Sequence, residues 1–234
     1  MHILTQADLL VLWEIGRLLL PLEQGILALE TAFPDERENV ADWPIGQRNR
    51  ALVQLHCASF GQRLRGWTAC RECAEKLEFE IDGQALLERV PATHEQFVVV
   101  HGQRYRLPTS RDLAAVIHEP DPMTGARRLM DQCSTVDKLP TNSWTEEDVD
   151  TVGQSMAAAD PLAEILLSFD CPSCGAYFEE ILDFPSFVWA EIDARVSRLL
   201  FEVHTLALAY GWSQSEILSM STARRQFYLK ILRA

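Results

Sequence analysis

The spacing of apolar residues predicts a mostly helical chain, and the clearest signal lies in residues 184–234. There an apolar residue recurs at every third or fourth position, which is the repeat of a helix that buries one face. The residues that set this repeat are Val188, Ile192, Val196, Leu199, Val203, Leu206 and Tyr210. Gly211 follows as a helix stop, and Ser213 with Glu216 forms a capping box that opens a further helix. A last helix carries an apolar stripe made of Phe227, Tyr228, Ile231 and Leu232. Such a stripe is typical of a buried face, and aromatic side chains exposed to a partner are the alternative.

Helical spacing also predicts three helices near the start of the chain, over residues 6–20, 21–32 and 44–60. Thr5 stands where it can cap the first helix, Pro21 begins the second, and Gly61 ends the third. The first helix is expected to have a broad apolar face, made of Leu9, Leu12, Trp13, Ile15, Leu19 and Leu20. The residues of the third helix that are expected to face solvent are Arg48, Asn49 and Arg50.

The middle of the chain predicts short strands and short helices. Residues 76–82, KLEFEID, alternate apolar and charged side chains as a half-buried strand does. Residues 96–107 are interpreted as a hairpin, and the connection through Leu64 and Trp67 as a short helical segment. Further helices are predicted from a cap at Ser110, over residues 125–133, from Thr145 and from Asp160-Pro161, with a turn at PDPMTG and a flexible segment at STVDKLPTNSW.

Two cysteine pairs with the same spacing carry the candidate chemistry: Cys70-Arg71-Glu72-Cys73 and Cys171-Pro172-Ser173-Cys174-Gly175. The sequences that follow are alike, AEKLEFEID and AYFEEILD, so each pair reads as one half of a repeated site. Two cysteines three residues apart on a tight turn aim both sulfurs at one ion, and two such turns complete a tetrahedral shell. We therefore predict a structural Zn²⁺ site whose halves pair through the strand after each turn, with the ligands Cys70, Cys73, Cys171 and Cys174.

The two halves of this site differ in their turn residues. Pro172 fixes the entry to the second turn and Gly175 suits a left-handed backbone, whereas the first turn has neither and is expected to be weaker. Between Cys73 and Cys171 stand 97 residues. Closing such a loop costs roughly 4 kcal/mol plus a constant, and structural zinc supplies about 10–16 kcal/mol in small peptides, so the separation is tolerated. Iron also suits four thiolates, and buried free cysteines or one redox-active pair are the alternatives.

Composition places the chain among ordinary globular proteins. Its 234 residues are 47% hydrophobic and 24% charged, which suits one large domain or two small ones. Six cysteines in this length do not make a disulfide scaffold, and a reducing compartment is expected. Cys57 and Cys133 lie on predicted helices and are interpreted as small buried apolar residues.

The net charge of −13 argues against a nucleic-acid surface, because phosphate contacts need clustered Lys and Arg. It favours basic or apolar protein partners. Residues 134–183 hold eleven acidic side chains and the single Lys138, whereas all charged side chains after Glu216 are basic. This asymmetry is interpreted as a solvated acidic face and a basic helix end, with a docking patch as the alternative.

Motifs of known catalytic sites are absent, and no enzyme is predicted. The chain has no GxSxG, HExxH, Walker or GxGxxG sequence, and His204 is interpreted as a core histidine. Four thiolates would also leave the metal no open position for water. The apolar segment LLVLWEIGRLLL is interrupted by Glu14 and Arg17 and ended by Pro21, so neither a membrane span nor a targeting signal is predicted.

The order of these sequence features resembles a family of contractile phage tails and contractile injection systems, the T4-type baseplate proteins. The stretches that carry the resemblance are PIGQRNRALVQLHCASFG, the first cysteine pair with LEFEID, YRLPTSRDL, CPSCG and EVHTLALAYGWSQSEILSMSTARRQFYLKIL, of which the last is the most specific. The first cysteine pair departs from the CPxCG form. The resemblance implies a non-enzymatic baseplate or hub component, or an assembly factor. Its partners would be other baseplate, hub or spike proteins, in the bacterial cytoplasm during assembly and in the baseplate of the finished particle.

Together these patterns predict an α+β, mostly helical fold. Helical N- and C-terminal parts would be joined by a discontinuous four-cysteine zinc-ribbon-like β element, which carries a small α/β insertion and fixes the angle between the helical parts. The predicted parts are 1–66 (N-terminal helices), 67–83 with 168–183 (the two half-sites), 84–167 (the insertion) and 184–234 (C-terminal helices). Rival functions are a zinc-ribbon nucleic-acid module and a CxxC thiol oxidoreductase.

Overall fold

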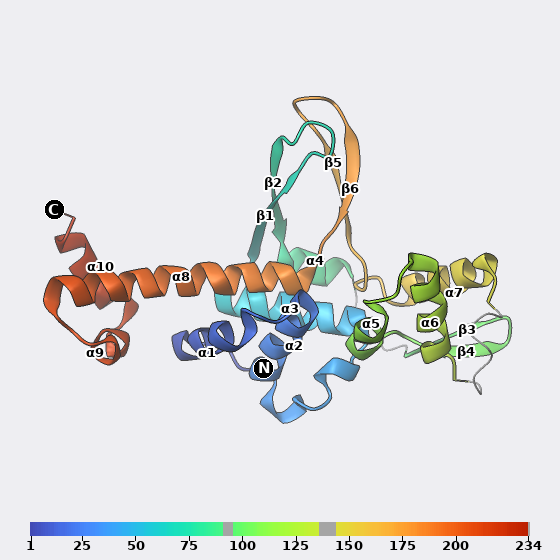
Figure 1. Ribbon diagram of the computed structural model, residues 1–234, viewed down its shortest axis with the longest axis horizontal. Coiled ribbons are helices and arrows are strands. Elements are labelled where there is room, and N and C mark those ends of the chain that lie inside the picture. The colour runs from blue at the N-terminus through green and yellow to red at the C-terminus, as the bar shows by residue number, and fades with distance from the viewer. Residues whose placement is uncertain (91–95, 136–143, 234) are drawn as a thin grey trace.

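The computed structural model of the chain describes residues 1–90, 96–135 and 144–233. Helices make up most of it, and the described strands form three antiparallel sheets of two strands each. The predicted α+β, mostly helical class with a discontinuous four-cysteine element is therefore confirmed. In Figure 1, two hairpins rise from a central helical body, and the insertion and the C-terminal helices lie at opposite ends of the molecule.

Four helices build the central body: α1 (Gln6–Gly16), α2 (Pro21–Ala32), α3 (Ile45–Phe60) and α8 (Phe184–Tyr210). The short 3₁₀ turns η1 (Pro34–Glu36) and η2 (Val40–Asp42) connect α2 to α3. Helix α1 ends at Gly16 rather than at residue 20. Gly16 packs closely against α8, since a Cβ at this position would lie 2.3 Å from the Trp189 ring. Its buried face is also narrower than predicted, because Ile15 is exposed while Leu9 and Leu12 are buried.

The N-terminal helices and the first two-thirds of α8 share one hydrophobic core. Its members come from both ends of the chain and include Leu12, Leu29, Leu52, Leu55, Phe184, Val188 and Ile192. Direct packing therefore holds the orientation of the two helical parts, which differs from the expectation that the cysteine element fixes it. Burial of such side chains supplies most of the stability of a domain of this size.

Two hairpins stand on this body. Strands β1 (Arg63–Ala69) and β2 (Lys76–Asp82) form the first, and β5 (Leu166–Asp170) and β6 (Tyr177–Ile181) form the second. Leu64 and Trp67 thus lie in a strand rather than a helix, and Asp160-Pro161 leads to β5 without a helix between them. Each strand pairs within its own half, so the prediction that the two halves pair with each other as a ribbon is wrong.

The insertion has a small core of its own. Helix α4 (Gly83–Arg89) stands at its start and packs against the central body instead. After α4 come β3 (Phe97–Val100), β4 (Gln103–Arg106), α5 (Ser110–Val116), α6 (Pro122–Cys133) and α7 (Glu146–Ala159). The buried residues of this core are Val98, Val100, Tyr105, Leu107, Met130, Trp144 and Val152. The predicted hairpin and the Thr145 cap are confirmed. The cap of α5 is Thr109 rather than the predicted Ser110. Helix α6 is capped by Asp121 and so begins within the predicted turn PDPMTG. Most of the segment predicted to be flexible, residues 136–143, lies outside the described residues.

A buried polar cluster ties α3 to the segment that returns from the insertion. Arg48 and Asn49 are 5% and 3% exposed, which contradicts the prediction that they face solvent. The Asn49 side-chain amide donates to the Leu162 carbonyl at 2.7 Å, and the Gly46 N–H donates to Asp160 at 2.8 Å. Burial lowers the pKa of Arg48 to about 10 and raises the pKa of Asp160. These polar groups are satisfied by one another, which makes their burial tolerable.

The C-terminal end of α8 extends past the body and carries α9 (Gln214–Ser219) and α10 (Thr222–Ile231) (Figure 1). Val203, Leu206, Ile217 and Leu229 form a separate small core there. The predicted stop at Gly211 and the capping box from Ser213 are confirmed. The interpretation of the last apolar stripe as a buried face is wrong, because Phe227, Ile231 and Leu232 are exposed while Leu229 and Arg225 are buried. The interpretation of His204 as a core histidine is wrong too, because His204 is exposed.

Candidate metal centre

Each cysteine pair lies in the turn at the tip of its hairpin, and the two turns have the same backbone hydrogen bonds. In the first turn, the Cys70 N–H donates to the Glu75 carbonyl at 2.8 Å and the Ala74 N–H donates to the Cys70 carbonyl at 2.9 Å. The equivalent bonds of the second turn join Cys171 to Ala176 at 2.9 Å and Gly175 to Cys171 at 2.8 Å. The repeated half-site suggested by the sequence is therefore repeated in the backbone as well.

Both turns place the residue after the second cysteine in the left-handed region. Gly175 has φ 74° and Ala74 has φ 60°. Glycine adopts this conformation without steric strain, whereas a residue with a Cβ pays roughly 1–2 kcal/mol for it. The first half-site therefore contains local strain that the second does not, at the position where the sequences of the two turns differ.

Exchanging these residues should change stability in opposite directions. We expect Gly175→Ala to lower the free energy of unfolding by about 1–2 kcal/mol, and Ala74→Gly to raise it by up to about 1 kcal/mol. Urea unfolding of the metal-loaded protein measures both. Gly153→Ala, within helix α7 where a Cβ meets nothing within 4 Å, is the control and should be stabilising. If Gly175→Ala and Gly153→Ala change the free energy of unfolding equally, the assignment of strain to the turn is contradicted.

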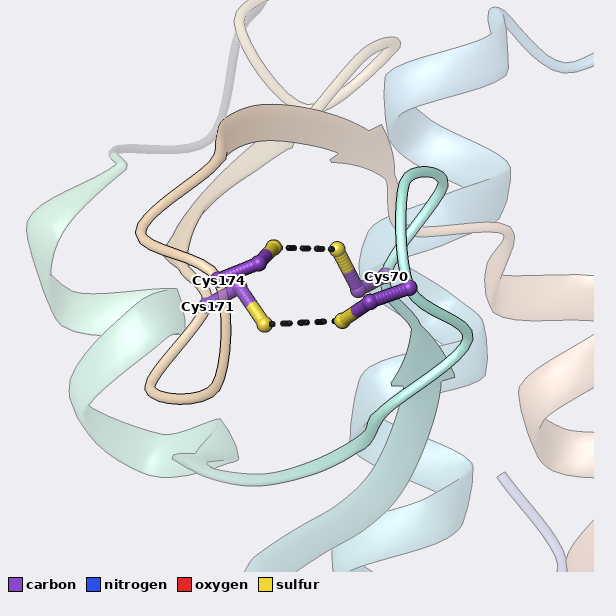
Figure 2. A group of neighbouring side chains, drawn as sticks. Cys70, Cys171 and Cys174 are labelled. Atoms are coloured by element: carbon purple, nitrogen blue, oxygen red, sulfur yellow. Dashed lines mark hydrogen bonds between the residues drawn. The ribbon is translucent and has the colours of Figure 1, made fainter.

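The two turns bring the four cysteine sulfurs together, as Figure 2 shows. All four Sγ atoms lie within 4.8 Å of one another. The Cys70 and Cys174 sulfurs are 3.6 Å apart and the Cys73 and Cys171 sulfurs 3.5 Å, and all four cysteines are free thiols. Four thiols so close to one another can hold a metal ion. In the described part of the chain, this is the one group of three or more His, Cys, Asp or Glu side chains with such geometry.

The cluster has one covered side and one open side. Cys70 and Cys171 are buried, at 3% and 2% exposed, whereas Cys73 and Cys174 are exposed. Phe178, Leu77 and Phe169 pack against the buried pair. Arg71, between the first two cysteines, reaches across and donates to Glu180 on the other hairpin at 3.0 Å. The sequence pattern did not single out Arg71, because its partner lies more than a hundred residues away.

The sulfurs influence one another's charge. Hydrogen bonds from the backbone N–H groups of Cys73 and Glu72 favour the Cys70 thiolate and lower its pKa to about 7. The Glu75 N–H also favours the Cys73 thiolate, but the sulfurs of Cys171 and Cys174 outweigh it and raise the pKa of Cys73 to about 12. The pKa of Cys174 is raised as well. Without a cation, one cysteine of the site therefore loses its proton readily, and that negative charge opposes deprotonation of the next.

A row of aromatic rings connects the cluster to the helical body. From the cluster downward, successive ring centroids are 5.4 Å apart for Phe178 and Phe169, 5.8 Å for Phe169 and Phe79, and 6.5 Å for Phe79 and Phe187. Gly66 stands opposite Phe79 in the β1–β2 register, and a Cβ there would lie 2.5 Å from the Phe79 ring. Aromatic pairs of this kind contribute about 0.5–1.5 kcal/mol each beyond area burial. Below their tips, the hairpins are thus linked by the contact between Phe79 and Phe169.

Cys57 and Cys133 lie outside the cluster. Cys133 is fully buried, and burial raises its pKa to about 12, as expected for a cysteine that packs as an apolar residue. Cys57 is half-buried, and burial raises its pKa too. No helix of the described structure is long and apolar enough to cross a membrane.

Comparison with known protein families, with curated proteins and with solved structures finds no match for this chain. The geometry of the cysteine cluster and the pattern of the sequence remain as the grounds for assigning a function.

Proposed function

We propose that the four cysteines hold a structural Zn²⁺ ion. Zinc–thiolate bonds of about 2.3 Å in a tetrahedron separate the sulfurs by about 3.8 Å. The four sulfurs lie within 4.8 Å of one another, and two of their pairs, Cys73–Cys171 and Cys70–Cys174, are 3.5 and 3.6 Å apart. This match is the observation that carries the proposal. Four protein ligands leave no position for water or substrate, so the ion would stabilise the fold rather than react. Elemental analysis of protein purified without chelator should find one zinc per chain; iron in its place would contradict the proposal.

Zinc binding should depend on pH. In the metal-free protein, Cys73 with a pKa of about 12 and Cys174 with a raised pKa both carry protons at neutral pH. Zinc binds thiolates, so these protons must leave, and zinc affinity should increase as pH rises between about 6 and 8. Calorimetry in buffers of different ionisation enthalpy measures the protons released, and we expect at least two. Cys57→Ser is the control and should release the same number, whereas zinc affinity independent of pH would argue against this site.

The wider role that we propose is a non-enzymatic structural component or assembly factor of the baseplate or hub of a contractile tail or contractile injection system. Support comes from the stretches that resemble T4-type baseplate proteins. They form helix α3, both hairpin turns, the β4–α5 connection and the end of α8 through α10. Partners would be other baseplate, hub or spike proteins, met in the bacterial cytoplasm during assembly. The baseplate of the finished particle is the second location proposed.

Mass spectrometry of purified contractile particles, together with a pull-down of the tagged chain from lysate, tests this role. Presence of the chain in particles and in complexes with tail proteins indicates a structural component. Presence with tail proteins in lysate alone indicates an assembly factor. If the chain is found with tail proteins in neither sample, the baseplate role fails while the zinc assignment stands.

A thiol oxidoreductase is a weaker alternative for the same cysteines. A redox-active pair gains its reactivity from a helix N-terminus or from nearby cations. Here Cys171 and Cys174 lie in the turn of a β-hairpin, opposite two further thiols. Turnover of a disulfide substrate by the zinc-free protein would be evidence for the oxidoreductase function.

A further inference from the structure

A groove of about 460 Å³ opens between the two hairpins, below the cysteine cluster and above helix α8. Its walls come from β1 and β6, and its base comes from Asp183 and the first two turns of α8, up to Glu191. This volume lies in the range of sites that bind small ligands or short peptide segments. In Figure 1, the hairpins stand apart over α8 and approach each other at their tips.

The groove runs along two strand edges that have no partner. Consecutive residues of β1, Arg65–Thr68, and of β6, Glu180–Ile181, line it, whereas β2 contributes only Phe79 and β5 only the alternate residues Leu167 and Phe169. Such consecutive lining means that the backbone itself borders the groove. Each of these strands pairs on one side alone within the described structure, β1 with β2 and β6 with β5. Their free edges therefore offer backbone N–H and C=O groups to an added strand.

The floor of the groove is apolar and aromatic. Phe79, Phe169 and Phe187 lie in it, together with Leu167. Gly66 adds no side chain to the β1 wall, so the Phe79 ring is reached from the groove. The wall of four β1 residues is about 13 Å long at 3.3 Å per residue. It therefore matches an extended segment with apolar side chains on one face.

The charged residues that line the groove favour a positively charged ligand. Three acidic residues, Glu180, Asp183 and Glu191, line it against one basic residue, Arg65. Glu180 pairs with Arg71 at 3.0 Å, Glu191 with Arg195 at 2.8 Å, and Arg65 with Glu80 at 2.7 Å, which leaves Asp183 as the lining acid outside an ion pair in the described ranges. The Asp183 carboxylate accepts a hydrogen bond from the Ser186 hydroxyl. The net charge of −13 adds a field of the same sign. A cationic segment is therefore attracted and an acidic one repelled.

We propose that this groove binds an extended segment of a partner protein in which apolar residues alternate with Lys or Arg. The segment adds a strand to a free hairpin edge, directs its apolar side chains at the three phenylalanines, and places a cation near Asp183. This recognition goes beyond the proposed scaffold role and does not depend on it. It requires only the two hairpins as they stand.

Selection from a library of displayed random peptides of about 12 residues, with the metal-loaded full-length chain as bait, tests the proposal. Ala190→Trp fills the groove from an exposed position on α8, and Ala209→Trp is the matched control on the same helix outside the groove. We expect enriched peptides to alternate apolar and cationic residues. They should bind Ala209→Trp like the wild type and Ala190→Trp at least about tenfold more weakly. Ala190→Lys, with Ala209→Lys as its control, provides a second variant that repels a cation without adding an aromatic ring.

Hydrogen exchange distinguishes strand addition from simple side-chain binding. Bound peptide should slow amide exchange in β1 or β6 and leave α9 and α10 unchanged. The proposal is overturned if no peptide is enriched, if the enriched peptides are acidic or lack alternation, if binding survives both Ala190 variants, or if neither edge becomes protected.

Discussion

Cys171→Ser is expected to abolish metal binding and to separate the two hairpins while the helical body stays folded. Cys171 is one of the two buried members of the cluster, so its loss removes a ligand from the covered side. Structural zinc supplies about 10–16 kcal/mol in small zinc-finger peptides, which sets the upper limit of the effect. The shared core of α1, α2, α3 and α8 contains none of the four cysteines, so its packing does not require the metal.

Zinc content and hydrogen exchange together measure this outcome. The variant should contain no zinc, and exchange should accelerate in β1, β2, β5 and β6 but not in α2 or α3. Cys57→Ser replaces a half-buried thiol outside the cluster and should keep both its zinc and its exchange pattern. Unchanged zinc content in Cys171→Ser would disprove the four-cysteine site. Loss of protection throughout the chain would instead show that the body depends on the metal.

The second large effect is expected at the buried ion pair that attaches α10 to α8. Arg225 and Glu202 are 3.2 Å apart, with side chains only 1% and 9% exposed. Glu202→Ala leaves the Arg225 guanidinium buried without a carboxylate, with the Met220 carbonyl at 2.7 Å as its nearest remaining acceptor. Breaking such a pair from one side costs about 3–5 kcal/mol. Urea unfolding and exchange in α10 should both report this loss.

A double variant separates the charge from the packing. Glu202→Leu with Arg225→Met removes both charges and keeps similar volume, and it should recover most of the lost stability. The single variant Arg224→Met is the control, because Arg224 is exposed and its loss should change the free energy of unfolding by less than about 0.5 kcal/mol. A double variant no more stable than Glu202→Ala would show that the ion pair itself, and not the desolvated charge, governs the attachment of α10.

The cysteine site could be predicted from the sequence because its chemistry is local. Two residues at fixed spacing define each half, and the similar segments after Cys73 and Cys174 show that the halves match. The long helix α8 was equally accessible, since Val188 and Ile192 belong to a repeat that only one helical face satisfies. Capping residues such as Ser213 act within one turn, so their effect is also visible in the sequence.

Other parts depend on contacts that the sequence does not display. Asn49 is buried because the Leu162 carbonyl, 113 residues later, accepts its amide hydrogen bond. Strand β1 was interpreted as helical because Trp67 falls on the same face as Arg63 and Arg65, which breaks the alternation of apolar and charged residues. Trp67 is exposed there, and both arginines pair with Glu80. In the last helix Arg225 is buried because it donates a hydrogen bond to Glu202 of α8. The spacing of apolar residues does not indicate this pairing.

The two turns that meet at the cysteine cluster are made at different times. A chain leaves the ribosome from its N-terminus at roughly 5–20 residues per second, so the 97 residues between Cys73 and Cys171 take roughly 5–20 s to synthesise. During this interval the nascent chain carries two thiols of an unfinished shell, open to oxidants and to competing ions. Capture of the final ion is therefore a late event in biosynthesis, and the early pair stays exposed to oxidation until then.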